Sequence, residues 1–310
     1  MHNVHFYSFR ILLKKGSTKS FKLGDLNINP KITAYDIIEK FFNLYKTQAI
    51  EFGASKTVIS LDGFNQLTFD SKKKLIYGYV KTGKYGEVAE IKDKNLIKLN
   101  YQTKLDDVVL MDRYLMIYLP DNLDEGFVAV HAANNISPRT IIFDKIIEYI
   151  KKTYKLEARF NPLQHKKIPD AILDAELSDI RAIGFKPHMD ITDAKGKKAT
   201  HIESTLIIKN ENGMFGTLRK IMNKNVGDII EVIEKRCDDV KVGLKVGNRN
   251  IVFNYQSILK KGISVELDDD NININVATGV PSLKDIHAEI VSISNDLLLE
   301  IHSGNKGVKI

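Results

Sequence analysis

The chain has 310 residues, of which 43% are hydrophobic and 27% charged, and its formal net charge is +7. This balance is typical of globular proteins with a packed core and argues against global disorder. No run of about eighteen apolar residues occurs, so no membrane-spanning helix is expected. The single cysteine, Cys237, excludes an internal disulfide, and the first residues lack the pattern of a signal peptide, so we predict a cytoplasmic protein.

The positive charge favours a polyanionic partner, chiefly nucleic acid, because lysine and arginine displace the counterions that surround a phosphate backbone. A lysine-rich composition with no such partner explains the same surplus equally well, since many chains carry dispersed, solvated lysines. Net charge therefore leaves both interpretations open, and the choice between them depends on where the basic residues lie along the chain.

The first half of the chain predicts strands with two helices among them. Thr33 stands three residues before Asp36, the spacing of a helix N-cap with a capping carboxylate, and Gly53 is the expected end of that helix. Ser137 and Pro138 are expected to begin a second, amphipathic helix. Strands are predicted at 5–13, at 57–69 as a hairpin turning at Asp62-Gly63, at 114–119 and at 126–131.

The second half is also mixed. Residues 215–236 predict helix, and Pro281 opens a last helix whose apolar residues cover a wide arc. Such an arc fits a helix buried in its own domain or one shared with a second copy of the chain, and periodicity does not distinguish the two. Strands are predicted at 156–160, 180–185, 204–210 and 263–267, and a hairpin is predicted at 240–255 with its tip at 247–250.

The order of these elements predicts the fold class. Strands and helices do not alternate regularly, which disfavours a doubly wound parallel sheet. We therefore predict an α+β fold of two domains, with mixed or mainly antiparallel sheets and packed helices. An N-terminal α/β domain is expected at 1–135 and a basic α+β domain at 136–310, with a polar connection near 193–200.

The stretch "IYGYVKTGKYGE" at 76–87 contains Gly78, Gly83 and Lys84 at the spacing of a phosphate-binding P-loop. That loop needs a helix after it and a serine or threonine directly after the lysine. Here the next residue is Tyr85, and no helical pattern follows. We interpret the stretch as a hairpin that turns at 81–84, with Gly78 as a strand glycine, and expect no nucleotide or other cofactor.

Two further patterns bear on catalysis. Glu90 and Lys92 have the E-x-K spacing of many metal-dependent nucleases, because a strand places both side chains on one face, and Asp70 could supply another carboxylate. The spacing is also frequent by chance in chains rich in lysine and glutamate, so the nuclease is kept as an alternative. Eight scattered histidines and one cysteine form no zinc motif. We predict no metal site and no catalytic residue.

Basic residues cluster at three places in the second half. Lys241 and Lys245 alternate with apolar residues and so predict one cationic strand face, with Arg249 at the tip of the hairpin. Such a hairpin can lie along a phosphate backbone, whereas separate solvated patches are the alternative. The candidate nucleic-acid-binding residues are Lys166, Lys167, Lys209, Arg219, Lys220, Lys224, Lys241, Lys245 and Arg249.

The order of segments from 114 to 301 resembles the RexA-like family of phage superinfection-exclusion and anti-phage proteins. The pair "LMIYLPDNLDEGFVAV" leads into a helix, and "KLEARFNPL", "SDIRAIGF" and "STLIIKNENG" precede the basic hairpin and the C-terminal helix. The closest points are "FNPL" at 160–163, Ile183-Gly184, and the strand that ends at Lys209. The shared features are segment order and a few residues, without a catalytic motif.

The resemblance implies a cytoplasmic, non-catalytic homodimer of two domains. It implies binding to duplex DNA with little sequence preference and a role as sensor or effector in phage defence by abortive infection. It also implies a partner from the same defence system, which in the lambda system is a membrane protein. The alternatives are the nuclease and a protein-interaction module without nucleic acid.

Overall fold

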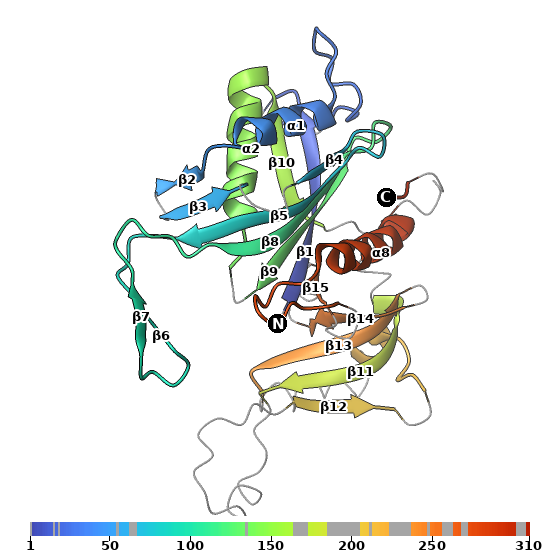
Figure 1. The fold of residues 1–310 in the computed structure, drawn as a ribbon. Coiled ribbons are helices and arrows are strands. Elements are labelled where there is room, and N and C mark those ends of the chain that lie inside the picture. Colours follow the sequence, from blue (N-terminus) through green and yellow to red (C-terminus); the bar gives the residue numbers. More distant parts are fainter. Residues whose placement is uncertain are drawn as a thin grey trace, which may run out of the picture. The chain divides into compact units, whose positions relative to one another are not determined.

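The computed structural model of the chain has an α+β fold built mainly from antiparallel strands (Figure 1), as predicted. It describes all residues except 1, 15, 18, 54–55, 62–66, 134–135, 164–172, 185–204, 211–212, 223–236, 247–248, 256–262, 268–271 and 302–307. The described helices are α1 (Ala34–Leu44), α2 (Arg139–Tyr154), α5 (Leu218–Met222) and α8 (Leu283–Ile301). None of these described helices is both long and apolar enough to cross a membrane.

The chain divides into two compact units. Unit 1 contains residues 1–161, 269–290 and 310, and unit 2 contains 162–268 and 291–309. Compactness does not test whether a unit folds independently. The division into two domains at residue 135 therefore stays a prediction.

Unit 1 is built on an antiparallel sheet. Its strands, in spatial order, are β1 (His2–Leu12), β9 (Gly126–Ala133), β8 (Met111–Tyr118), β5 (Leu75–Lys84), β3 (Thr57–Ser60) and β2 (Ile50–Phe52), with β10 (Glu157–Pro162) beside β1 and β4 (Thr68–Asp70) beside β5. Strand β9 is buried at every position. A strand covered on both faces is apolar throughout instead of alternating, which explains the sequence "GFVAVHAA".

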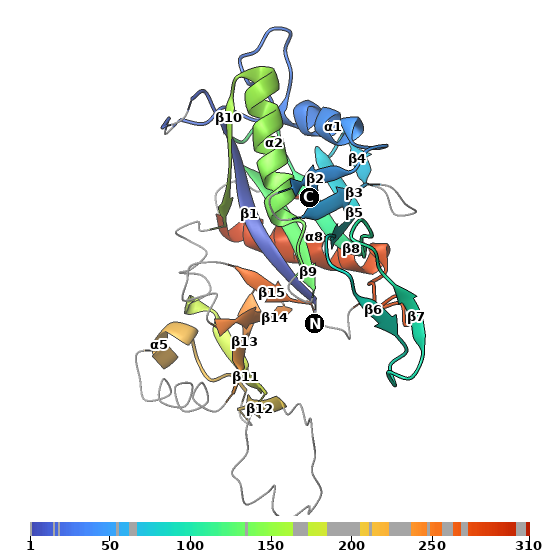
Figure 2. The ribbon, with the colours of Figure 1, turned by 90° about the vertical axis from the view of Figure 1, so that its left-hand side faces the viewer.

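One face of this sheet is covered by α1 and α2 (Figure 2). Ile76, Leu115 and Val128 project from neighbouring strands into the same core as Phe41 of α1 and Ile142 of α2, and all five are fully or almost fully buried. Burial of a large apolar side chain contributes about 1.5–3 kcal/mol. This cluster is therefore the main source of stability in unit 1.

Two predictions about this part of the chain are wrong in detail. Helix α1 ends at Leu44 and not at Gly53, because Ile50 enters β2 and pairs with Ile59. Residues 57–69 are not a hairpin, because β3 pairs with β2 and β5 while β4 pairs with β5. The turn predicted at Asp62-Gly63 lies outside the described residues. In both places sheet pairing between distant segments overrides the local pattern.

The P-loop-like stretch forms part of β5. This strand continues through Gly78 to Lys84 and pairs along its length with β8, so Gly78 is a strand glycine, as predicted, and the turn predicted at 81–84 is wrong. After it come β6 (Glu90–Lys92) and β7 (Leu99–Gln102), a separate two-stranded sheet. A P-loop needs a helix N-terminus facing the phosphates, and here the following element is a strand.

The other face of the sheet receives the first turns of α8. Tyr79 donates a hydrogen bond from its hydroxyl to the carbonyl of Pro281 at 2.6 Å. The His287 ring stacks on Tyr77 with 3.7 Å between centroids, and its Nδ1 is 2.6 Å from the hydroxyl of Tyr114. Burial, with a smaller effect from Lys73, lowers the pKa of His287 to about 4. The neutral imidazole therefore holds the start of α8 on the sheet.

Unit 2 contains its own run of antiparallel strands. Its strands, in spatial order, are β12 (Thr205–Lys209), β11 (Glu176–Ile183), β13 (Asp239–Val246), β14 (Arg249–Asn254) and β15 (Ser264–Glu266). The predicted hairpin is confirmed, with Val246 opposite Arg249 at its end. Val240, Val242 and Leu244 alternate along β13 and are buried. They form part of the apolar face of this sheet.

The cap of α1 gives a first test. Asp36 donates its backbone N–H to the Thr33 hydroxyl at 3.2 Å, and its carboxylate accepts from the Thr33 backbone N–H at 2.9 Å. We expect Thr33→Ala to lower the free energy of unfolding by about 1 kcal/mol, because it leaves the backbone N–H of Asp36 without its acceptor. Urea titration measures this, with the exposed Ser71→Ala as control. Equal stability of the two variants contradicts the prediction.

The His287 contact gives a second test. Its folded pKa lies below the ordinary 6.5, so the unfolded chain binds the proton first and acidification favours unfolding. The contribution of His287 is complete above pH 6.5 and is lost as the pH falls towards 4. We expect the wild type to lose about 1–3 kcal/mol more than His287→Gln between pH 7 and pH 4.5 in urea titrations. An identical loss in both proteins contradicts the assignment.

Candidate nucleic-acid interface

The sheet of unit 2 has one face that carries charged side chains. Strand register places Lys209, Asp179 and Gly243 in one row across three strands, and Arg181 lies opposite Lys241 in a neighbouring row. Residues directly opposite each other, and residues two apart on one strand, share a face. Asp179, Arg181, Lys209, Lys241 and Lys245 therefore lie on the same side, which we call the charged face.

The carboxylates on this face are held by neighbouring donors. Asp179 accepts from Arg181 Nε at 2.7 Å and from the Ser178 hydroxyl at 2.8 Å. Glu266 of β15 forms an ion pair with Lys241, with 2.5 Å between Nζ and Oε2. Buried or half-buried charges are stable when they are paired and hydrogen-bonded in this way. Two acids of the charged face are thus neutralised by two of its own cations.

A glycine makes room for one of these carboxylates. Gly243 lies opposite Asp179, and a Cβ at this position would overlap the Asp179 carboxylate. A side chain at this position would therefore displace the carboxylate from Arg181. The glycine between Lys241 and Lys245 is therefore required by packing.

Lys241 has a structural role in this arrangement. Its side chain is only 4% exposed and is paired with Glu266, so it is not presented to solvent as the cationic-face prediction required. The sequence did not show this, because Glu266 is on another strand, beyond β14. Lys245, four residues along the same strand, is exposed.

The remaining candidate residues have different surroundings. Lys209 on β12 and Lys220 on α5 are exposed. Arg219 pairs with Asp174, with 2.6 Å between Nε and Oδ1. Arg249 begins β14, and its side chain is not described. Lys166, Lys167 and Lys224 lie outside the described residues.

The charge of the chain is also distributed differently from the expectation. Residues 162–310 contain 21 lysines and arginines and 21 aspartates and glutamates, whereas residues 1–161 contain 25 and 18. The whole surplus of +7 therefore lies in the first 161 residues. The second half is neutral as a whole, so a cationic surface there depends on a few exposed lysines.

The residues of the nuclease alternative form ordinary surface contacts. Glu90 and Lys92 pair with each other, with 2.7 Å between Oε2 and Nζ, on an exposed strand. The Asp70 carboxylate accepts from the backbone N–H groups of Lys72 and Lys73 and so stabilises a turn. Within the described part of the chain, no three acidic, histidine or cysteine side chains are grouped as metal ligands. These contacts give the nuclease alternative no support.

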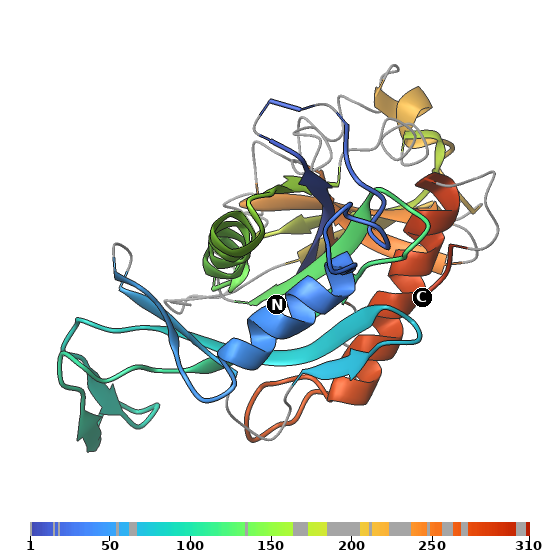
Figure 3. The same cartoon turned by 90° about the horizontal axis from the view of Figure 1, so that it is seen from above.

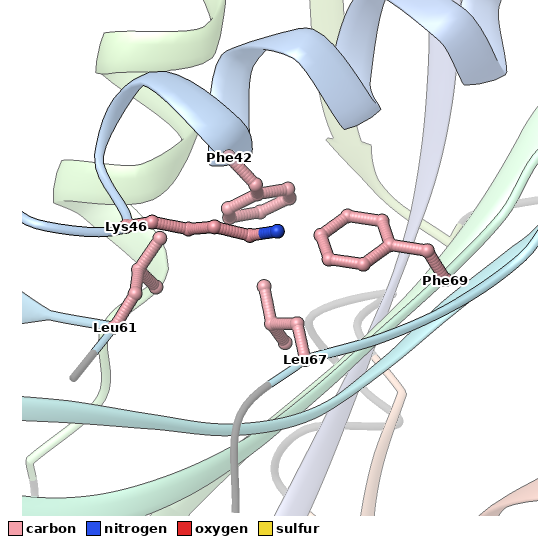
Figure 4. A pocket seen from close by; sticks show the side chains of 5 residues that line it. All are labelled: Phe42, Lys46, Leu61, Leu67 and Phe69. Atoms are coloured by element: carbon pink, nitrogen blue, oxygen red, sulfur yellow. The ribbon is translucent and has the colours of Figure 1, made fainter. Parts of the chain in front are cut away.

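Unit 1 has a small apolar pocket lined by residues from α1 and the adjoining strands. Lys46 extends between the rings of Phe42 and Phe69, and its Nζ lies 5.6 Å from the centroid of Phe69 (Figure 4). Leu61 and Leu67 complete the described lining. A lysine over an aromatic face is a stabilising cation–π contact. We therefore interpret this pocket as packing and not as a catalytic site.

Comparison with known proteins does not show a family for this chain. No family model matches the chain, and no curated protein matches it. The resemblance to RexA-like proteins and the absence of enzymatic activity therefore stay predictions.

The two lysines of β13 separate the structural role from a binding role. We expect Lys241→Gln to lower the free energy of unfolding by about 1–3 kcal/mol, because it leaves the Glu266 carboxylate half-buried without its ion pair. Lys245→Gln removes the same charge from an exposed position on the same face and should cost less than about 0.5 kcal/mol. Urea titration of both variants measures this. Equal effects contradict the different roles.

Proposed function

We propose that the chain binds duplex DNA without sequence preference through the charged face of unit 2. The observation that carries the proposal is the exposure of Lys209 and Lys245 on a face where Asp179 and Glu266 already have cationic partners. Their positive charge is therefore not cancelled by those two acids. Glu176, opposite Lys245 on β11, offsets part of it.

The spacing of the two lysines suits a nucleic-acid backbone. They are two strands apart and displaced by two residues along the sheet. With about 4.8 Å between strands and about 3.3 Å per residue, their Cα atoms are on the order of 12 Å apart. This is similar to the width of the major groove, about 12 Å. Contacts to phosphates position a duplex without reading its bases, so little sequence preference is expected.

Two lysines per chain make a weak site, because each exposed phosphate contact contributes modestly and is screened by salt. A homodimer would present two copies of the face to one duplex and raise the apparent affinity. We propose that such a dimer acts as a sensor or effector in phage defence, because the order of its segments resembles that of RexA-like proteins. We also propose that it signals to a partner of the same defence system, which in the lambda system is a membrane protein. The proposed location is the cytoplasm.

A second candidate function is a protein-interaction module without nucleic acid. The observation that favours it is a group of exposed apolar residues on β6, β7 and their connections. Exposed apolar surface of this extent usually marks a site of protein contact. The apolar residues belong to unit 1 and the charged face to unit 2, so separate substitutions test the two candidate functions.

A mobility-shift titration with a duplex of arbitrary sequence tests DNA binding. We expect Lys209→Glu/Lys245→Glu to weaken binding at least tenfold at low salt and to reduce the slope of log K against log salt by about 2, since two phosphate contacts are lost. Lys22→Glu/Lys40→Glu changes the net charge equally, at exposed positions of unit 1, and should have a much smaller effect.

Two results would count against the proposal. One is the absence of any shift at micromolar wild-type protein in low salt. The other is equal weakening by the two double variants, which would show a response to net charge alone. Incubation of plasmid with magnesium in the same experiment addresses the nuclease alternative, because cleavage that disappears in Glu90→Ala would establish catalysis.

A further inference from the structure

Residues 87–110 form a projecting arm between the paired strands β5 and β8. Figure 3 shows the β6–β7 ribbon extending away from the rest of unit 1, and Figure 1 shows the same two strands apart from the main sheet. Ile91 lies opposite Tyr101 and Glu90 opposite Gln102. The arm is therefore an antiparallel hairpin attached to unit 1 only at its base.

The base of the arm is fixed by hydrogen bonds. Thr103 is buried, its backbone N–H donates to the carbonyl of Ala89 at 2.9 Å, and its hydroxyl accepts from the Ala89 N–H at 2.7 Å. Gly86 donates to the carbonyl of Leu105 at 2.8 Å. These bonds continue the ladder towards β5 and β8, so the arm is a defined ribbon and not an open loop.

The two faces of the ribbon differ in polarity. Ile91 and Tyr101 lie opposite each other and therefore share one face, and both are exposed. Leu99 is also exposed and lies opposite Lys92, beyond a bulge in the pairing. The opposite face carries Glu90, Lys92 and Gln102. A ribbon with one polar and one apolar face is the pattern of a half-buried sheet, yet within the described residues its apolar face is exposed.

The tip of the arm also presents apolar side chains. Leu96 has a φ of 61° and is 75% exposed, and the next residue, Ile97, is 83% exposed. The left-handed region is normally occupied by glycine or asparagine. The Asp93 carboxylate accepts from the backbone N–H groups of Ile97 and Lys98 and stabilises this turn. The turn therefore holds two large apolar side chains in solvent at some conformational cost.

The arm contains most of the exposed large hydrophobic residues of the described chain, nine of fourteen. They are Val88, Ile91, Leu96, Ile97, Leu99, Tyr101, Leu105, Val109 and Leu110. With about 150–200 Å² for a fully exposed large side chain, their exposed surface is on the order of 800–1,000 Å². A stable interface buries about 800 Å² on each partner. A two-stranded ribbon is also marginally stable by itself and gains from further strands or packing.

We propose that the arm is a dimerisation element that packs against the arm of a second copy of this chain. A two-fold interface uses the same surface twice and must be complementary to itself. The arm meets this condition, because it contains four lysines and five acidic residues and is close to neutral. Its apolar area matches what each partner of a stable dimer buries. This inference does not depend on DNA binding.

Other partners fit the arm less well. A near-neutral surface offers little attraction to a polyanion. A lipid surface would cover the tip at Leu96 and Ile97, but the apolar residues continue through Leu99 and Tyr101 to Val109 near the base. A protein surface as long as the arm itself covers all of them.

The C-terminal helix, which the sequence also allowed as a dimer contact, offers less free surface. Of its apolar residues, Ile286, Ile290, Ile293, Leu297, Leu298 and Ile301 are buried within the single chain. Among the large apolar residues in the described part of α8, Leu299 is exposed. Burial within the single chain thus explains the wide apolar arc of α8 without a second copy. The apolar side chains of the arm, by contrast, are exposed in the described structure.

Two residues on opposite faces of the ribbon provide a matched test. Ile91 lies on the apolar face and Gln102 on the polar face, and both are exposed, so Ile91→Glu and Gln102→Glu introduce the same charge on opposite faces. We expect the wild type and Gln102→Glu to sediment as dimers at micromolar concentration. Ile91→Glu and Ile97→Glu should each weaken the dimer at least tenfold, because an unpaired charge is placed in the apolar contact.

Three results overturn the proposal. The first is a wild type that remains monomeric at 100 micromolar, taken as roughly the upper limit for a specific dimer of this area. The second is a dimer unaffected by both apolar-face substitutions, which would place the contact elsewhere. The third is a monomer that co-sediments with phosphatidylglycerol vesicles and loses this property in Ile97→Glu, which would identify the arm as a membrane contact.

Discussion

The pairing of β5 with β8 is the constraint on which unit 1 depends. It extends from Leu75 opposite Tyr118 to Thr82 opposite Met111, and both strands are buried on their two faces. One face supplies the core beneath α1 and α2, and the other supplies the tyrosines that hold the start of α8. The same pairing brings together the two ends of the arm, so the rigid sheet fixes where the arm leaves the protein.

The second constraint is electrostatic and belongs to unit 2. Asp179 and Glu266 are held by Arg181 and Lys241 on a face where a charge without a partner would be costly. One lysine of the β13–β14 hairpin, Lys241, is therefore engaged in an ion pair with Glu266. This arrangement also separates two kinds of lysine, because Lys241 is buried and paired with Glu266 whereas Lys209 and Lys245 are exposed.

The proposed functions are linked by assembly. Two exposed lysines on one chain are few for a DNA-binding protein, since affinity for a duplex grows with the number of phosphates contacted. A dimer formed through the arms would double that number without any new contact within the chain. Dimerisation through the arm would then support DNA binding through the charged face, and each of the two can be tested without the other.

The sequence by itself determined the local features. The N-cap at Thr33, the second helix after Pro138, the β13–β14 hairpin and the unsuitability of Gly78–Lys84 as a P-loop all follow from neighbouring residues, because caps, turns and alternation act over a few positions. Tertiary structure alone decided that α1 ends at Leu44, that β3 pairs with β5, that Lys241 is buried against Glu266 and that the arm stands free. Each of these depends on residues far apart in the chain, and a pattern read along one segment carries no information about which distant segment will cover it.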